Sequence, residues 1–158
     1  MKKSTSIAIY CLLLCTAVMA GAFVYQASQS DFVTLDGTSH KHADYLGKHV
    51  IVNYFAEWCA PCLKEVPELS EFNRIKGDDA VLFAVSYDNL SDEELRELKQ
   101  KYNMEFPLIA SLNTPFPFER PQYLPATYII NPDGTLKGQL FGEQSAQALI
   151  EAIEHNRP

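Results

Sequence analysis

Hydrophobic residues in this chain fall into short continuous runs, separated by stretches with helical spacing. The runs at residues 50–55 and 80–86 predict buried strands, because a strand covered on both faces is apolar without alternation. Residues 127–130 predict a further strand, and residues 31–37 an edge strand that ends in a turn. Residues 135–141 predict a strand that pairs back on 127–130, since the intervening Asn-Pro-Asp-Gly is a turn sequence.

Helical spacing is found between these strands. Residues 59–75 predict one helix, and residues 91–102 a second, which begins with the capping box Ser-Asp-Glu-Glu. Residues 145–155 predict a final amphipathic helix. Residues 106–110 add a short segment, and residues 113–125, with four prolines, predict a loop. The order β-β-α-β-α-β-β-α implies an α/β domain with parallel pairing and right-handed crossovers.

The first thirty residues predict a targeting segment. Two lysines near the start precede residues 7–25, a run of 19 residues without a charge. At a rise of about 1.5 Å per residue, such a run can just cross a bilayer core as a helix. Ala-Gly-Ala at residues 20–22 also offers a cleavage site, so a removed signal peptide stays open as an alternative. We expect residues 1–30 to be an anchor or signal with a linker, and residues 31–158 to form one domain.

The positive start predicts that this domain lies outside the cytoplasm. In a bacterium, that places the chain in the inner membrane with the domain facing the periplasm, or in the periplasm if the segment is cleaved. The formal net charge is −7, and both N-terminal lysines lie outside the domain, so the domain is more acidic still. No basic patch is left to attract nucleic acid, so nucleic-acid binding is not expected.

Four cysteines divide into two pairs. Cys11 and Cys15 lie in the apolar run and are expected to act as small apolar side chains. A lipid-modified Cys15 is the alternative, but a leucine rather than a small residue precedes it. Cys59 and Cys62 are left in the domain, and one close pair is not a framework of structural disulfides.

The second pair forms the sequence Cys59-Ala60-Pro61-Cys62, between a predicted strand and a predicted helix. A helix N-terminus carries partial positive charge and unpaired N–H groups, and both stabilise a thiolate. The thiolate is the nucleophile of disulfide exchange. Pro61 fits the first turn, where its missing N–H costs nothing. The pattern predicts a redox-active pair with no cofactor and no metal, because no two further ligands have the spacing of a zinc site.

Two blocks of sequence carry a family resemblance. The first is GKHVIVNYFAEWCAPCLKEVPEL at residues 47–69, and the second is LPATYIINPDG at residues 124–134. With the predicted helix at 91–102, they make residues 31–155 resemble the TlpA/ResA-like family of membrane-anchored, extracytoplasmic thiol–disulfide oxidoreductases. The resemblance implies a thioredoxin-like fold, with a central mixed β-sheet flanked by helices.

The resemblance also implies roles for residues of the site. Cys59 would be the attacking thiol, being the more exposed at the helix start, and Cys62 the resolving thiol. Pro125 matches the family's cis-proline that faces the cysteine pair. A cis X–Pro bond there would place the backbone of Leu124 beside the sulfurs, ready to pair with an extended substrate segment.

Glu65 lies one helical turn after Cys62 and can face back toward its sulfur. Related proteins carry a glutamate there that adjusts the thiol pKa values, whereas classical thioredoxins use a buried aspartate at the position of Asn53. We expect Glu65 to handle protons, against the alternative of an ordinary exposed helix residue. Trp58 and Pro61 are expected on the substrate-facing surface, against plain core packing of the tryptophan.

Two segments depart from the family pattern or invite another interpretation. The family commonly has a short helix before the cis-proline, whereas the proline-rich residues 114–121 cannot form a regular helix. Phe116 and Phe118 in this loop could form an apolar docking patch, but packing on the core is the expectation. His40-Lys41-His42 is expected to be a solvated loop rather than a metal site.

The sequence therefore predicts an extracytoplasmic thiol–disulfide oxidoreductase, working as a reductase. The resemblance implies substrates such as apocytochrome c or other exported cysteine-containing proteins, and a membrane electron donor that re-reduces the pair. One alternative is an oxidase that donates its disulfide, since direction depends on the reduction potential. Ala-Pro between the cysteines is near the Gly-Pro of reducing proteins and favours a reductase. An alternative of another class is a copper-delivery module.

Overall fold

The computed structural model describes residues 14–16, 18–19, 21 and 29–154. The chain divides into two compact units, one up to Ser30 and one from Asp31 onward. Within the described residues, no helix is long and apolar enough to cross a membrane. Most of the anchor predicted at residues 7–25 lies outside the described residues, and so does Cys11.

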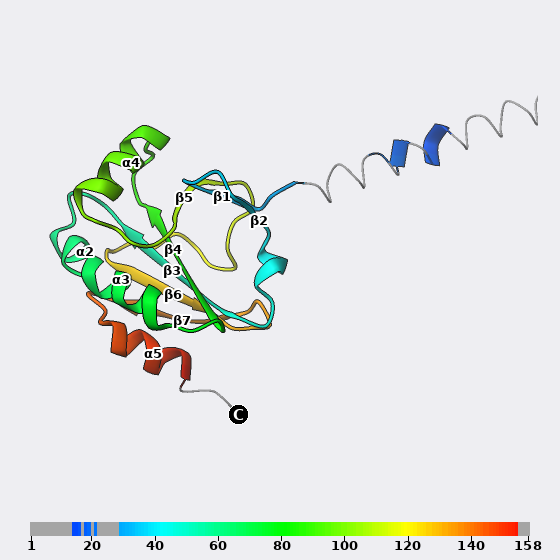
Figure 1. Ribbon diagram of the computed structural model, residues 1–158. Coiled ribbons are helices and arrows are strands. Elements are labelled where there is room, and N and C mark those ends of the chain that lie inside the picture. The colour runs from blue at the N-terminus through cyan, green and yellow to red at the C-terminus, as the bar shows by residue number, and fades with distance from the viewer. Residues whose placement is uncertain (1–13, 17, 20, 22–28, 155–158) are drawn as a thin grey trace, which may run out of the picture. The chain divides into compact units, whose positions relative to one another are not determined.

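The second unit is built on one mixed sheet, seen in Figure 1, with the strand order β2-β1-β5-β4-β3-β6-β7. Its strands are β1 (Phe32–Thr34), β2 (Ser39–His40), β3 (His49–Phe55), β4 (Ala80–Ser86), β5 (Leu108–Leu112), β6 (Ala126–Ile130) and β7 (Leu136–Phe141). Strands β3, β4 and β5 are parallel, while β6 runs antiparallel to β3 and β7 antiparallel to β6. The predicted thioredoxin-like α/β fold with a mixed central sheet is confirmed.

The N-terminal side of the sheet differs from the prediction. Strand β1 is not at the edge, because β2 pairs on its outer side and β5 on its inner side, and Phe32 is fully buried. A strand of two residues is too short to leave a hydrophobic pattern, so β2 escaped the sequence analysis. The short segment expected at residues 106–110 is the start of a full strand, β5, which begins directly after Pro107.

The helices are η1 (His42–Tyr45, a 3-10 helix), α2 (Ala60–Lys64), α3 (Val66–Ile75), α4 (Asp92–Lys101) and α5 (Ala146–Glu154). The prediction of one helix over residues 59–75 is wrong, because the helix is interrupted at Glu65. Pro67 has no N–H to donate to the carbonyl of Leu63, and its ring collides with that carbonyl in a continuous helix. The interruption turns Glu65 into the junction between α2 and α3.

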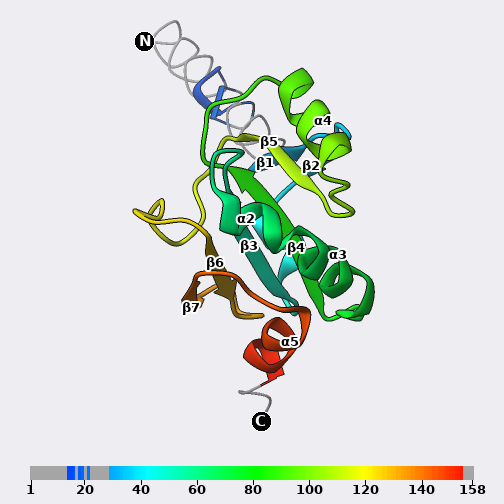
Figure 2. The ribbon, with the colours of Figure 1, turned by 90° about the vertical axis from the view of Figure 1, so that its left-hand side faces the viewer.

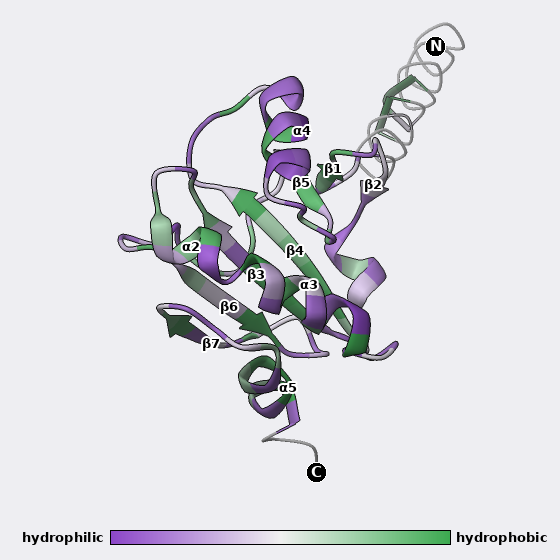
Figure 3. Cartoon of the chain, turned by 60° about the vertical axis from the view of Figure 1, so that its left-hand side comes forward, coloured by the Kyte–Doolittle hydropathy of each residue, from purple (hydrophilic) through white to green (hydrophobic). Residues whose placement is uncertain are grey.

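One face of the sheet packs against the helices. Figure 2 shows α2 and α3 in front of β3 and β4. Leu69 of α3, Leu95 of α4 and Leu149 of α5 share a buried cluster with Ile51 and Phe55 of β3. Figure 3 shows α4 as hydrophilic over most of its length, which agrees with a helix that contacts the core along one narrow strip. The predicted capping box at its start is present, since the Ser91 hydroxyl accepts the Glu94 N–H.

The opposite face of the sheet is covered by aromatic side chains rather than by a long helix. Phe116, from the proline-rich loop, is buried, and its ring centroid lies 5.7 Å from that of Phe32. Phe118 stacks on Tyr128 of β6 with 3.8 Å between ring centroids. Core packing of this loop is therefore confirmed, and the docking-patch alternative is wrong for Phe116. The loop covers the sheet where the family commonly has a helix.

His40 and His42 do not lie in a solvated loop, so the expectation for residues 40–42 is wrong. The His40 ring stacks on Phe32, with 4.9 Å between ring centroids. Its nitrogens lie 3.0 Å from the Thr34 hydroxyl and 2.7 Å from the Tyr45 hydroxyl. The His42 ring packs against Phe32 and Phe116. Both rings thus help to hold β2 and η1 on the sheet.

Candidate active site

The cysteine pair lies where β3 leaves the sheet and α2 begins. Cys59 is the N-cap residue of α2, in extended backbone conformation, and it forms a disulfide with Cys62. The sulfur of Cys59 accepts the backbone N–H of Cys62 at 3.3 Å. Cys59 is 6% exposed and Cys62 is 1% exposed, so the predicted order of exposure holds although both are classed as buried.

The hydrogen bond from the Cys62 N–H favours the ionised form of the Cys59 thiol once the disulfide is reduced. The sequence analysis expected an unpaired N–H of the first helical turn to stabilise a thiolate. In the structure, the backbone N–H of Cys62 is the group in that place. Pro61 lies in this first turn with its side chain exposed. The pair can therefore offer a nucleophilic thiolate at Cys59 and a more deeply buried partner at Cys62.

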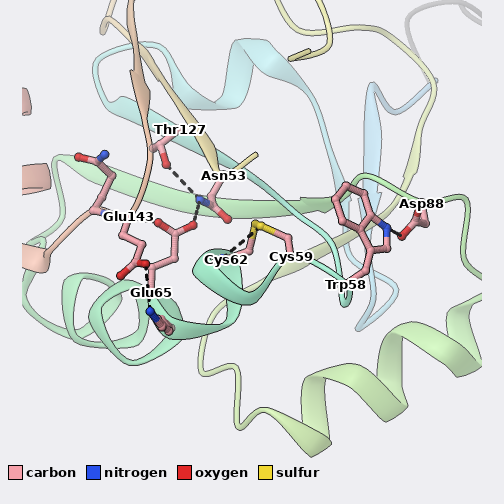
Figure 4. Close-up of a disulfide and its surroundings, with 10 residues drawn as sticks. Asn53, Trp58, Cys59, Cys62, Glu65, Asp88, Thr127 and Glu143 are labelled. Carbon is pink, nitrogen blue, oxygen red and sulfur yellow. Dashed lines mark hydrogen bonds and ion pairs between the residues drawn. A yellow bond between two sulfur atoms is a disulfide. The ribbon is translucent and has the colours of Figure 1, made fainter. Parts of the chain in front are cut away.

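Trp58 lies on the surface directly before the disulfide. Its side chain is 66% exposed, so the alternative of plain core packing is wrong. The indole Nε1–H donates to Asp88 at 2.9 Å, and the ring meets Tyr87 edge-on. Together, Trp58 and Pro61 form an exposed rim beside two buried sulfurs, as Figure 4 shows for the tryptophan.

The turn before the disulfide is fastened to α4 by Glu57, a residue that the sequence analysis did not single out. The Glu57 carboxylate accepts hydrogen bonds from Lys101 Nζ at 2.8 Å and from the Tyr102 hydroxyl at 3.1 Å. These bonds lower the pKa of Glu57 below its usual value. The partners lie more than forty residues apart in the chain, so no local pattern could reveal the pairing.

The Leu124–Pro125 peptide bond is cis, as the family resemblance implied. In the register of β3 and β6, Tyr54 lies opposite Ala126. Pro125 directly precedes Ala126, so it lies at the end of β3 from which the cysteine turn departs. Pro125 is buried and Leu124 half-buried.

Glu65 is 1% exposed, so the alternative of an ordinary exposed helix residue is wrong. One carboxylate oxygen accepts a hydrogen bond from Asn53 Nδ2 at 2.7 Å, and the other accepts the backbone N–H of Gln144 at 3.1 Å. Burial raises the pKa of Glu65 to about 7, although these two hydrogen bonds oppose the rise; the charge of Glu143 adds to it. A carboxyl group with this pKa can both bind and release a proton near neutral pH.

Asn53 connects Glu65 to the sheet and lies on the side of the disulfide. Residues alternate between the two faces of a strand, so Asn53 shares the face of Ile51 and Phe55, toward the helices. Its side chain is fully buried and also donates to the Thr127 hydroxyl at 3.0 Å. Figure 4 shows it between the Glu65 carboxylate and the disulfide. The sequence analysis had treated Asn53 only as a missing carboxylate.

Within the described part of the chain, no group of three or more histidine, cysteine, aspartate or glutamate side chains is placed to hold a metal ion. The groups gathered at the site are the two sulfurs, the buried carboxyl group of Glu65 and the amide of Asn53. A thioredoxin-like domain with a disulfide at a helix start defines the class of thiol–disulfide redox proteins.

The chain belongs to the AhpC/TSA family, whose model matches residues 23–139. It is 28% identical over 153 residues to the thiol-disulfide oxidoreductase ResA of Geobacillus kaustophilus, an alignment that covers 90% of this chain and 81% of the relative. It is also 28% identical over 166 residues to ResA of Bacillus cereus, with 95% and 94% covered.

Among solved structures, the exposed lipoprotein thioredoxin Etrx1 of Streptococcus pneumoniae matches with a TM-score of 0.64. The match has 21% identity and covers 78% of this chain and 96% of the other, which shows a common fold. The predicted TlpA/ResA-like family is confirmed by the relatives. The family and the Cys59–Cys62 pair together make this protein a thiol–disulfide oxidoreductase.

Proposed function

We propose that this oxidoreductase works outside the cytoplasm and reduces disulfides of exported proteins through Cys59 and Cys62. The observation that carries the proposal is the pairing of two unequal sulfurs with a buried carboxyl group. The Cys59 sulfur accepts an N–H at the helix start, while Cys62 is more buried, on the side of Asn53 and Glu65. This asymmetry suits a nucleophile followed by a resolving thiol.

In the first step, the Cys59 thiolate attacks one sulfur of the substrate disulfide. A bond forms between Cys59 and that sulfur, the substrate S–S bond breaks, and the other substrate sulfur leaves as a thiolate. The Cys62 N–H that Cys59 accepts stabilises the attacking anion. The exposed rim of Trp58 and Pro61 lies where the substrate segment would rest.

In the second step, Cys62 loses its proton and attacks the Cys59 sulfur. The mixed disulfide breaks, the second substrate thiolate leaves, and the Cys59–Cys62 disulfide forms. Two electrons have then passed from the pair to the substrate, and the two substrate thiolates are protonated from solvent. Glu65, with a pKa of about 7, is suited to take up the proton that Cys62 gives up.

Continued turnover needs a donor that reduces the Cys59–Cys62 disulfide again. We propose a membrane protein that offers a dithiol, because an oxidising compartment does not reduce a disulfide. Substrates would be cysteine-containing exported proteins, of which apocytochromes c are one class that the family resemblance implies.

Two observations support the location. The uncharged run at residues 7–25 follows two lysines, and the structural relative Etrx1 is described as an exposed lipoprotein. A fusion of alkaline phosphatase to the C-terminus tests this: activity in intact bacterial cells supports export. An inactive fusion, with a cytoplasmic reporter active at the same position, would contradict it.

The direction of electron flow is tested by the equilibrium reduction potential of the full-length protein in mild detergent, measured in dithiothreitol and glutathione buffers. A value below about −230 mV supports a reductase, and a value near −120 to −150 mV would make the protein an oxidant instead. If no redox transition occurs, the reaction as proposed is wrong. Titration of the reduced protein with Cu(I) would then test the copper-delivery alternative.

A further inference from the structure

The side chain of Asn53 is fully buried, yet among the described residues only its amide nitrogen makes hydrogen bonds. Its Nδ2 donates to both Glu65 and Thr127, whereas its Oδ1 has no hydrogen-bond partner among the described residues. Leaving a buried acceptor unpaired destabilises the folded state, so an unpaired oxygen beside a reactive centre calls for an explanation. Figure 4 shows this oxygen on the side of the disulfide, away from Glu65.

The oxidised state explains why the oxygen has no partner. The sulfurs of a disulfide carry no hydrogen, so neither can donate to Oδ1. Reduction places an S–H on Cys62, and a thiol is a weak donor that a carboxamide oxygen can accept. The Cys62 S–H of the reduced protein is thus a candidate donor to the Asn53 Oδ1.

We propose that Asn53 is a positioning residue that couples the protonation of Glu65 to that of Cys62. Its amide can present either its oxygen or its nitrogen to each of these two residues. This inference rests on the proposed function, in which Cys62 must become a thiolate in the second step. In this role, the neutral side chain of Asn53 links the buried carboxyl group of Glu65 to the sulfur of Cys62.

Two arrangements satisfy every group around the amide. When Glu65 is ionised, Nδ2 donates to its carboxylate, as observed, and Oδ1 accepts the S–H of Cys62. When Glu65 is protonated, the amide turned by half a rotation accepts the carboxyl O–H at Oδ1 and donates from Nδ2 to the Cys62 thiolate. Thr127 fits both, because a hydroxyl can accept from Nδ2 or donate to Oδ1.

The two arrangements contain the same number of protons and the same net charge. They differ in whether one proton resides on the Cys62 sulfur or on a Glu65 oxygen, and the proton exchanges with solvent. A buried site avoids changes of net charge, because an uncompensated charge in a low-dielectric interior is costly. Coupling through Asn53 thus lets the resolving thiolate form without adding charge to the interior.

The other groups that face Glu65 are few. Gln144 contributes its backbone N–H, and Glu143 contributes a charge that is itself paired with Lys64 at 3.7 Å. From β3, Asn53 donates to Glu65, and from β6, the Thr127 hydroxyl contacts Asn53. Among these groups, Asn53 is the one shown on the side of the sulfurs.

The test is a double-mutant cycle read at the Cys62 thiol. In a Cys59→Ser background of the full-length protein, the pKa of Cys62 is measured from the pH dependence of its alkylation by iodoacetamide, with mass spectrometry to identify the site. Glu65→Gln is expected to shift this pKa by about one unit or more. In the Asn53→Leu background, which has similar volume but no amide, the same substitution is expected to shift it by less than a third of that amount.

Glu68→Gln is the matched control. Glu68 lies one turn further on and accepts the backbone N–H of Ala146, but it is exposed and does not contact Asn53. Its substitution is expected to leave the Cys62 pKa within a few tenths of a unit in both backgrounds. Equal shifts from Glu65→Gln with and without Asn53 would overturn the proposal, because they would show that the charge acts through space.

If Asn53→Leu does not fold, a second measurement replaces it. In the reduced, unmutated protein, the side-chain ¹⁵NH₂ resonances of Asn53 are expected to titrate with the same midpoint as the Glu65 carboxyl carbon and to lose that transition in Glu65→Gln. Resonances that do not change with pH would overturn the proposal. Neither measurement depends on the direction of electron flow, so a failure here is distinct from a failure of the reductase assignment, which the reduction potential decides.

Discussion

The strongest quantitative consequence of the structure concerns Glu65 and the stability of the oxidised protein. A pKa raised from 4.5 to about 7 means that the folded chain holds this proton more tightly than the unfolded chain. Between these two values, the unfolded state releases the proton while the folded state keeps it, so stability falls as pH rises. The group's contribution is fully present below about pH 4.5 and lost once the pH passes about 7.

The size of the effect follows from the shift. A difference of about 2.5 pKa units corresponds to roughly 3 kcal/mol in the free energy of unfolding, of which about 2.5 kcal/mol falls between pH 5 and pH 8. This is a large share of the roughly 5–15 kcal/mol by which a domain is stable. Glu65→Gln removes the titration and keeps the shape. The glutamine amide would face the Gln144 N–H, but that cost does not vary with pH.

The assay is guanidinium unfolding of the full-length, disulfide-intact protein in a mild non-ionic detergent, at several pH values from 5 to 8. We expect the unmutated protein to lose about 2.5 kcal/mol more than Glu65→Gln across this range. Every other titratable group is common to both proteins, so the comparison of slopes cancels its contribution. Parallel curves, differing by less than about 0.5 kcal/mol over the range, would refute the inference from burial to proton affinity.

Three further substitutions test other parts of the structure. Cys62→Ser is expected to trap a mixed disulfide between Cys59 and a disulfide substrate, seen by non-reducing electrophoresis, while Cys59→Ser traps none; the reverse pattern would exchange the two roles. Phe116→Ala should destabilise the protein by about 3–5 kcal/mol, because it opens a cavity beneath the proline-rich loop, whereas Phe141→Ala at an exposed site should cost under about 0.5 kcal/mol. Ser91→Ala should cost about 1 kcal/mol through loss of the helix cap, and urea unfolding that shows no change would mean that the cap contributes nothing.

Much of the fold could be predicted because its signals are local. The runs that became β3 and β4 are largely buried on both faces, and such strands are mostly apolar. The capping box at Ser91 and the cysteine pair are also short motifs, each with its own physical cause. Strand β2 and the interruption at Glu65 were missed for different reasons. The first is too short to show a pattern, and the second depends on Pro67, whose effect on Leu63 was outweighed by the helical spacing around it.

The chemistry of the site depends on contacts between residues far apart in the chain, and these leave no sequence pattern. Asn53 meets Thr127 because β3 and β6 pair in a particular register, and it meets Glu65 because α2 ends where Pro67 forces it to. The sequence could indicate that Glu65 is one turn from a cysteine, but not that the same residue is buried. Burial is what separates a proton-handling carboxyl group from a solvated one, since the two differ in proton affinity and not in residue type. The pH dependence of unfolding therefore tests the one property of Glu65 that only the tertiary structure supplies.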